Sequence, residues 1–178
     1  MPTLAWLVTE LQCTPFLPQK RSPVTHSLRI EVDQSGKMET SHATVLAYSN
    51  AHRYSILIPT RVKREVLGRL RARGLSRSLA AIRVFAAALW LLLRDELVNL
   101  TNVTIDPEYV GHEASIKAEL VQLAVNAGLK INPYLIQFAR IGKKSGAHTY
   151  ALGVARGKMR ADRLISSEDL LTVLGQQK

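Results

Sequence analysis

The segment from Ser27 to Ile58 constrains the fold most, because it holds three apolar, β-branched runs separated by two polar breaks. Leu28, Ile30 and Val32 alternate with charged residues, which is the period of a half-buried strand. Connections this short favour antiparallel pairing of consecutive strands, so the segment predicts a β-meander. The predicted strands cover residues 28–32, 44–48 and 53–58, with turns at 34–37 and 49–52.

After the meander, helical and strand patterns alternate, which predicts an α/β domain. The predicted sheet is mixed and five-stranded, in the order β-β-β-α-α-β-α-β-α, with helices on both faces. The helix predicted from Ser76 to about Leu97 is apolar nearly all round and should be buried. The predicted helices are 61–73, 76–97, 112–127 and 160–174, and the later strands are 100–105 and 134–141, with a further short strand at 149–154.

The balance of charge favours an anionic partner. The chain of 178 residues has 24 Lys and Arg against 14 Asp and Glu, a formal net charge of +10. Nucleic acid is the first expectation and a membrane surface the second, while the bland alternative is a general solubility effect. The apolar run from Leu79 to Leu93 is shorter than the ~20 residues that a membrane span needs, so no membrane insertion is expected.

A single cysteine, Cys13, excludes an intrachain disulfide and a cage of cysteine ligands. A reducing, cytoplasmic setting fits this composition, and the apolar start lacks the basic region of a signal peptide. Residues 1–24 contain four prolines and are interpreted as an N-terminal arm, followed by one domain over 25–178.

Four acids carry the chemistry. Asp33 ends the first strand and Asp106 the fourth, so they lie side by side if these strands are neighbours. Glu65, in a helix, and Asp162, near the start of the last helix, are aimed at the same place in this interpretation. Clustered carboxylates repel one another, and Mg²⁺ relieves this because it prefers oxygen ligands. Two such ions about 3.5–4 Å apart support phosphodiester hydrolysis.

The order of these elements and acids resembles the ribonuclease H-like superfamily, which includes ribonuclease H, Holliday-junction resolvases and transposase cores. The resemblance covers roughly residues 27 to 174. Its motifs are IEVDQSG for the first strand, RVKREVLGRL for the helix with Glu65, VTIDPEYVGHEASI for the fourth strand and ARGKMRADRLI for the last helix.

The resemblance implies a nuclease that depends on Mg²⁺ or Mn²⁺ and leaves 3′-hydroxyl and 5′-phosphate ends. The catalytic and metal-binding residues it implies are Asp33, Glu65, Asp106 and Asp162. The chain departs from the simplest members by having two helices between Glu65 and Asp106. Other acids compete for the fourth place, namely Glu108, Glu113, Glu119 and Asp169.

Basic residues are expected to hold the nucleic-acid backbone. Most lie on the helix 61–73 or in the turn GKKSG at 142–146, and His148 stands where some members of the superfamily carry a catalytic-loop histidine. The predicted nucleic-acid-binding residues are Arg61, Lys63, Arg64, Arg69, Lys143, Lys144, His148 and Lys158.

Each of the four acids also has a purely structural interpretation. Asp33 and Asp106 can be turn residues, Glu65 can pair with a nearby arginine, and Asp162 can balance a helix dipole. Two other functions are kept open: a catalytically silent nucleic-acid-binding module, and an interaction domain that uses the apolar helix 79–93 as an interface. The substrate type stays open between hybrid, single strand and junction, and junction cleavage would call for a homodimer.

Overall fold

The computed structural model describes residues 28–49 and 52–175. The proposed N-terminal arm at 1–24 lies outside these residues. One mixed sheet of six strands, in the order β5-β4-β1-β2-β3-β6, organises the described chain. The strands are β1 (Leu28–Ser35), β2 (Thr44–Ser49), β3 (Arg53–Ile58), β4 (Leu100–Ile105), β5 (Ile136–Phe138) and β6 (Arg163–Leu164). The helices are α1 (Thr60–Ala72), α2 (Arg77–Leu93), α3 (Glu113–Asn126), α4 (Gly146–Ala155) and α5 (Ser167–Gly175), with a 3-10 turn η1 (Pro133–Leu135).

The pairing of the strands confirms the predicted meander. β1 pairs with β2 and β2 with β3, both antiparallel, whereas β4 pairs parallel to β1 on its other side. β5 extends the sheet parallel to β4. The carboxyl ends of β1 and β4 therefore meet at one edge of the sheet, and β3, being parallel to β1, ends at the same edge.

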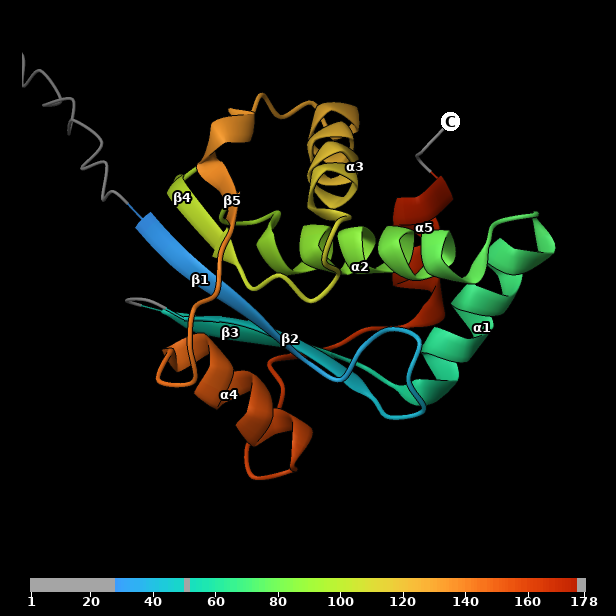
Figure 1. Cartoon of the computed structure of the whole chain (residues 1–178), viewed down its shortest axis with the longest axis horizontal. Helices are drawn as coiled ribbons and strands as arrows, with labels where there is room; N and C mark the ends of the chain where they lie inside the picture. Colours follow the sequence, from blue (N-terminus) through green and yellow to red (C-terminus); the bar gives the residue numbers. More distant parts are fainter. Residues whose placement is uncertain (1–27, 50–51, 176–178) are drawn as a thin grey trace, which may run out of the picture.

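Helices cover both faces of the sheet, as predicted (Figure 1). α4 lies alone on one face, where Tyr150, Ala151 and Val154 pack against Val45 and Ala47 of β2. α1, α2, α3 and α5 lie on the other face, which holds the larger hydrophobic core.

α2 is the central helix of that core. Ser76 caps its first turn by accepting a hydrogen bond from the backbone N–H of Leu79 at 3.2 Å. Thirteen of its side chains are buried, and among its large apolar residues only Leu79 is exposed, at 46%. The prediction that this helix is buried is confirmed, and α2 lacks the large exposed apolar patch that the alternative of an interaction domain would need.

The C-terminal third departs most from the predicted elements. Residues 149–154, expected as a strand, lie within α4, because Ala147, Tyr150, Ala151 and Val154 place their buried side chains at helical spacing. The predicted helix at 160–174 begins only at Ser167. The residues before it form β6, which pairs with β3 and makes the sheet six-stranded instead of five-stranded.

The strand predicted at 134–141 is also shorter. The first residues of this segment belong to the η1 turn, and only the three residues of β5 form a strand. Among the helices of the described residues, none has the length and apolar character required to cross a membrane.

Candidate functional site

Asp33 lies within β1, which ends at Ser35, three residues beyond the predicted 28–32. It pairs across the sheet with Ala47 of β2. Since directly paired side chains point to the same face, and Ala47 packs against α4, Asp33 also belongs to the face covered by α4. Its side chain is buried, with 5% of the residue exposed. Asp33 is therefore not a solvent-exposed turn residue, which was the structural alternative for this position.

Asp106 follows β4 directly and lies beside β1. Its backbone N–H donates to the carbonyl of Val32 at 3.0 Å, which continues the parallel β1–β4 ladder by one residue. The backbone N–H of Ile141 donates to its Oδ1 atom at 3.1 Å, so the loop after β5 holds this carboxylate in place. The prediction that Asp33 and Asp106 lie side by side is confirmed.

Glu108 is the third member of the acidic cluster, which we define as Asp33, Asp106 and Glu108. One carboxylate oxygen from each lies within 4.8 Å of the others. The backbone N–H of Glu108 donates to the carbonyl of Asp106 at 2.9 Å, a tight turn that brings the second acid back towards the first. Of the competing acids Glu108, Glu113, Glu119 and Asp169, Glu108 is thus the one that lies with the two aspartates.

Burial and repulsion raise the pKa of two members of the cluster, Asp33 and Glu108. Burial raises the pKa of Asp33, the His148 side chain opposes this rise, and the charge of Asp106 adds to it. Burial likewise raises the pKa of Glu108, with Lys37 lowering it and the two aspartates raising it further. The cluster is thus a place where extra positive charge is stabilising.

His148 lies on α4 and contacts the cluster from the covered face. Its Nδ1 atom is 3.0 Å from Oδ2 of Asp33. Ser145 fixes the start of this helix: its Oγ accepts from the N–H of Ala147 at 3.2 Å and donates to Glu31 of β1 at 2.5 Å. The N-terminal turn of α4 is thereby tied to β1 on the same face as Asp33.

A pocket of about 250 Å³ opens at the cluster. The loop after β5 forms one wall and contributes two cationic side chains, Arg140 and Lys143. The pocket thus brings carboxylates and cations together at the carboxyl edge of the sheet. Its lining residues are Asp33, Gln34, Asp106, Pro107, Glu108, Arg140, Ile141, Gly142, Lys143 and His148.

Glu65 and Asp162, the other two predicted ligands, do not join the cluster. Glu65 is exposed on α1, where it accepts from Arg69 at 2.9 Å and from Ser167 of α5 at 2.6 Å. These partners lower the pKa of Glu65, with Ser167 first. The pairing with Arg69 agrees with the structural alternative given above for Glu65. Its hydrogen bond with Ser167 also links α1 to α5.

Asp162 precedes β6 and fastens that segment to the sheet. Its Oδ2 atom accepts from the N–H and the hydroxyl of Ser55, both at 2.8 Å, and from the hydroxyl of Tyr150 at 2.6 Å. Ser55 pairs with Ala47, which pairs with Asp33, so Ser55 lies two strands away from Asp33, and Asp162 directly precedes β6, the next strand beyond. At about 4.8 Å per strand, this puts Ser55, and the Asp162 carboxylate bound to it, roughly 10 Å to the side of the cluster.

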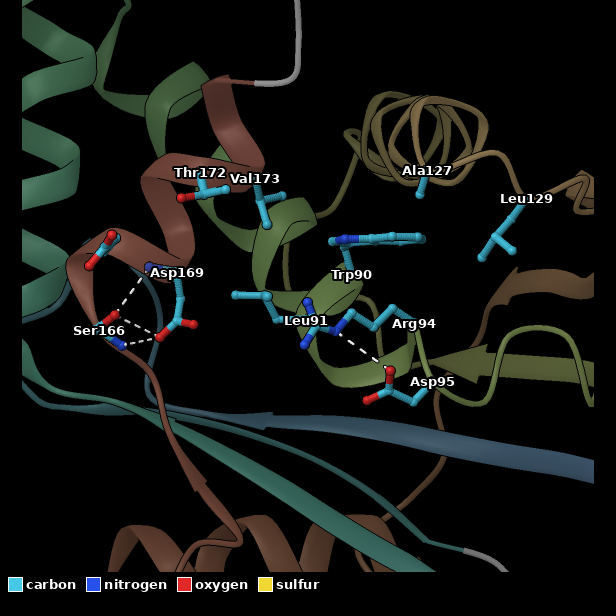
Figure 2. A pocket seen from close by; sticks show the side chains of 11 residues that line it. Trp90, Leu91, Arg94, Asp95, Ala127, Leu129, Ser166, Asp169, Thr172 and Val173 are labelled. Carbon is cyan, nitrogen blue, oxygen red and sulfur yellow. Dashed lines mark hydrogen bonds and ion pairs between the residues drawn. The ribbon is translucent and has the colours of Figure 1, made fainter.

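The remaining competing acids also lie elsewhere. Asp169 caps α5 by accepting from Ser166 at 2.7 and 2.8 Å and pairs with Arg163 at 2.6 Å. It lines a separate hollow of about 640 Å³ between α2, α3 and α5, and Trp90 lines the same hollow on the side of Ala127 and Leu129 (Figure 2). Glu119 pairs with Arg83 at 3.5 Å, and Glu113 stands in the first turn of α3.

Lys63 was predicted to face phosphate, and this is wrong. It is 1% exposed, and its Nζ atom donates to the carbonyl of Lys37 at 2.7 Å and to the Thr44 hydroxyl at 2.9 Å. The other predicted basic residues lie in contact with solvent, His148 only partly. Those residues are Arg61, Arg64, Arg69, Lys143, Lys144, His148 and Lys158.

Arg140 and Lys37 are the site residues that sequence reasoning missed. Arg140 stands two residues after β5, and the parallel pairing of β5 with β4 brings it to the pocket. Lys37 belongs to the turn after β1, and its Nζ atom lies 3.9 Å from Oε2 of Glu108. Recognising either residue required knowing which strands are neighbours.

Comparisons with protein-family models, curated proteins and solved structures find no match to this chain. The chemistry of the site therefore has to be inferred from its own geometry.

Proposed function

We propose that this protein is a divalent-metal-dependent nuclease of the ribonuclease H-like type, which hydrolyses phosphodiester bonds of nucleic acid. The observation that carries the proposal is the acidic cluster, whose three carboxylate oxygens lie within 4.8 Å of one another at the shared edge of β1 and β4. The net charge of +10 supports an anionic polymer as substrate.

The donor set fits Mg²⁺ or Mn²⁺. All three ligand atoms are carboxylate oxygens, which these hard cations prefer. The raised pKa values of Asp33 and Glu108 reflect burial and repulsion that a bound cation would relieve. A divalent ion at such a site supplies Lewis-acid polarisation of the phosphate and activation of a water.

The chain's own residues would hold and orient the reacting groups. Asp33, Asp106 and Glu108 hold the cation, and His148 orients the carboxylate of Asp33 through the 3.0 Å contact. Arg140 and Lys143 line the same pocket and would bind the phosphate on either side of the scissile bond.

The arrangement of the sheet supports the fold assignment. An antiparallel meander leads, parallel strands lie on the other side of β1, and one acid stands on β1 with another just after β4. The chain departs from the expected pattern in β6, and in taking its third carboxylate from the loop after β4 instead of from α1.

Cleavage of end-labelled hybrid, single-stranded, duplex and four-way-junction substrates with Mg²⁺ or Mn²⁺ tests the proposal. Asp33→Asn and Asp106→Asn should each lose cleavage by about 100-fold or more while keeping nucleic-acid binding. Glu65→Gln is the matched control, because Glu65 is an exposed acid bound to Ser167 and Arg69, and it should cleave as the wild type does. Equal loss in all three variants would contradict the assigned cluster.

A catalytically silent nucleic-acid-binding module is the second candidate. The observation that favours it is the engagement of Glu65 and Asp162 in structural contacts, which leaves three acids where the resemblance implies four. Tight binding of these substrates without cleavage under either metal would establish this alternative.

A further inference from the structure

Lys37 places a positive charge beside Glu108 of the acidic cluster, with about half of its side chain exposed to solvent. Its Nζ atom donates to the backbone carbonyl of Glu108 at 3.0 Å and lies 3.9 Å from Oε2 of the same residue. It also lies 5.8 Å from the ring centre of Tyr109, within the range of a cation–π contact. The Lys37 ammonium therefore contacts the backbone carbonyl and the carboxylate of Glu108, and also the ring of Tyr109, the next residue.

The backbone of Lys37 is held as firmly as its side chain. Its carbonyl accepts from the buried Lys63 ammonium at 2.7 Å, from the Thr44 hydroxyl at 3.2 Å and from the backbone N–H of Thr40 at 3.2 Å. These contacts fix the turn between β1 and β2 on the side facing α1.

Tyr109 joins the same turn to the loop of Glu108. Its hydroxyl accepts from the N–H of Met38 at 3.0 Å and donates to Glu39 at 3.2 Å, while its ring packs 4.9 Å from that of Phe85. The turn carrying Lys37 and the loop carrying Glu108 thus form one connected unit, which keeps the start of the Lys37 side chain next to Glu108.

We propose that the cluster holds one divalent cation and that Lys37 supplies the positive charge that a second cation would otherwise provide. This rests on the proposed function and deepens it. Three ionised carboxylates carry three negative charges, which one divalent ion and one ammonium balance. A second divalent ion would meet the repulsion of Lys37 and would lack the carboxylates of Glu65 and Asp162, which are bound elsewhere.

Titration of the full chain with Mn²⁺ in a calorimeter tests this directly. The wild type should bind one Mn²⁺ per chain. Lys37→Gln removes the charge but keeps an N–H donor, so it should bind Mn²⁺ about tenfold more tightly, because a cation near the ligands is lost. Lys37→Arg should bind as the wild type does, and so should Lys130→Gln, which removes the same charge from an exposed position outside the pocket.

Cleavage of the best substrate gives the second measurement. Lys37→Gln should cleave about 100-fold more slowly despite its tighter metal binding, and Lys37→Arg should recover much of the rate. A residue with only a structural role would not produce opposite changes in metal affinity and rate.

The outcomes separate this inference from the function on which it rests. Two Mn²⁺ per wild-type chain, or a Lys37→Gln variant whose affinity is unchanged or weaker, would overturn the inference and leave a metal-dependent nuclease standing. A wild-type chain that binds no Mn²⁺ and cleaves nothing would overturn both.

Discussion

At the scale of single residues, the acidic cluster lowers the stability of the protein at neutral pH when no cation is bound. Burial raises the pKa of both Asp33 and Glu108, so the folded chain binds more protons than the unfolded chain just above the ordinary carboxyl range. The contribution of these groups to stability is therefore present at acid pH and is lost as pH rises through the raised pKa values.

Thermal unfolding at neutral pH should show this cost. Without divalent cations, Asp33→Asn should be more stable than the wild type by about 1 kcal/mol, or roughly 2–4 °C in Tm. Mn²⁺ should raise the Tm of the wild type and leave that of Asp33→Asn nearly unchanged. A variant less stable than the wild type in chelator would show that the Asp33–His148 contact outweighs the repulsion.

Lys63 gives a second dependence on pH, with the opposite sign. Burial lowers the pKa of its ammonium to about 8, against an unfolded value near 10.5. Between these values the unfolded chain binds the extra proton, so this group makes the fold more stable as pH rises. From pH 7 to pH 9.5 the gain should be on the order of 2 kcal/mol.

Urea unfolding at several pH values checks this expectation. Lys63→Met fills a similar volume without a charge and should abolish the rise. If wild type and variant showed parallel pH profiles, the two hydrogen bonds of Lys63 would be holding its pKa near the ordinary value.

The residue scale also shows what a sequence can and cannot predict about a site. Asp33 and Asp106 were identified because each ends a strand, a local signal. Lys63 sits among arginines that are exposed, and only its packing under the turn after β1 distinguishes it. Glu65 was misassigned because its partner Ser167 is 102 positions away, beyond the reach of any local pattern.

At the scale of elements, α4 depends on its close approach to β2. A Cβ atom at Gly146 would overlap the hydroxyl of Ser49 and lie 3.2 Å from its Cβ. A side chain at this position would force the Ser49 hydroxyl to rotate away and the helix or strand to shift slightly, in the turn that carries His148.

Gly146→Ala should therefore destabilise the fold by about 1–2 kcal/mol through overpacking. Ser49→Ala in the same chain should restore part of the loss, since it removes the nearer atom. Gly68→Ala is the control: a Cβ there meets nothing within 4 Å in the middle of α1, so this change should stabilise by roughly 0.5–1 kcal/mol. Equal effects of the two glycine substitutions in urea unfolding would contradict the close packing.

The elements that were predicted well are those with a strong local period. The meander strands and α1, α2 and α3 match within a few residues, because each has a clear apolar pattern. α4 was missed at 149–154, where small and aromatic residues suggested a strand, although the cap at Ser145 and the buried spacing favour a helix.

At the scale of the whole molecule, the basic helix and the acidic pocket lie at the same edge of the sheet. β3 runs parallel to β1, so α1 begins at the carboxyl edge where Asp33 and Asp106 stand. Its exposed Arg61 and Arg64 are therefore well placed to bind the backbone of a nucleic acid whose phosphate enters the pocket.

Binding should weaken linearly with the logarithm of salt concentration over roughly 50–200 mM. Changing both Arg61 and Arg64 to alanine should flatten the slope by about 2, at roughly 0.9 per phosphate contact on duplex DNA. Fluorescence anisotropy with a labelled duplex measures this, with Lys130→Gln as the control. An unchanged slope in the double variant would move the nucleic-acid surface away from α1.

The overall architecture was predictable as an α/β domain with a mixed sheet, because the meander and the later alternation are visible in the sequence. The assembly of the site was less so. The contact between Asp33 and His148 joins residues 115 positions apart. It depends on α4 and on the connection that brings this helix back to β1, and neither was predicted from the sequence.

The two ends of the described sheet have a consequence for self-association. The outermost strands are β5 with three residues and β6 with two, and each covers only part of the six-residue strand beside it, so both rims are divided into short stretches. Long, flat rims template pairing with another chain, whereas rims this short do not. Within the described residues, the protein's β-structure is thereby poorly suited to stacking copy upon copy, and it should stay dispersed at high concentration without relying on its charge.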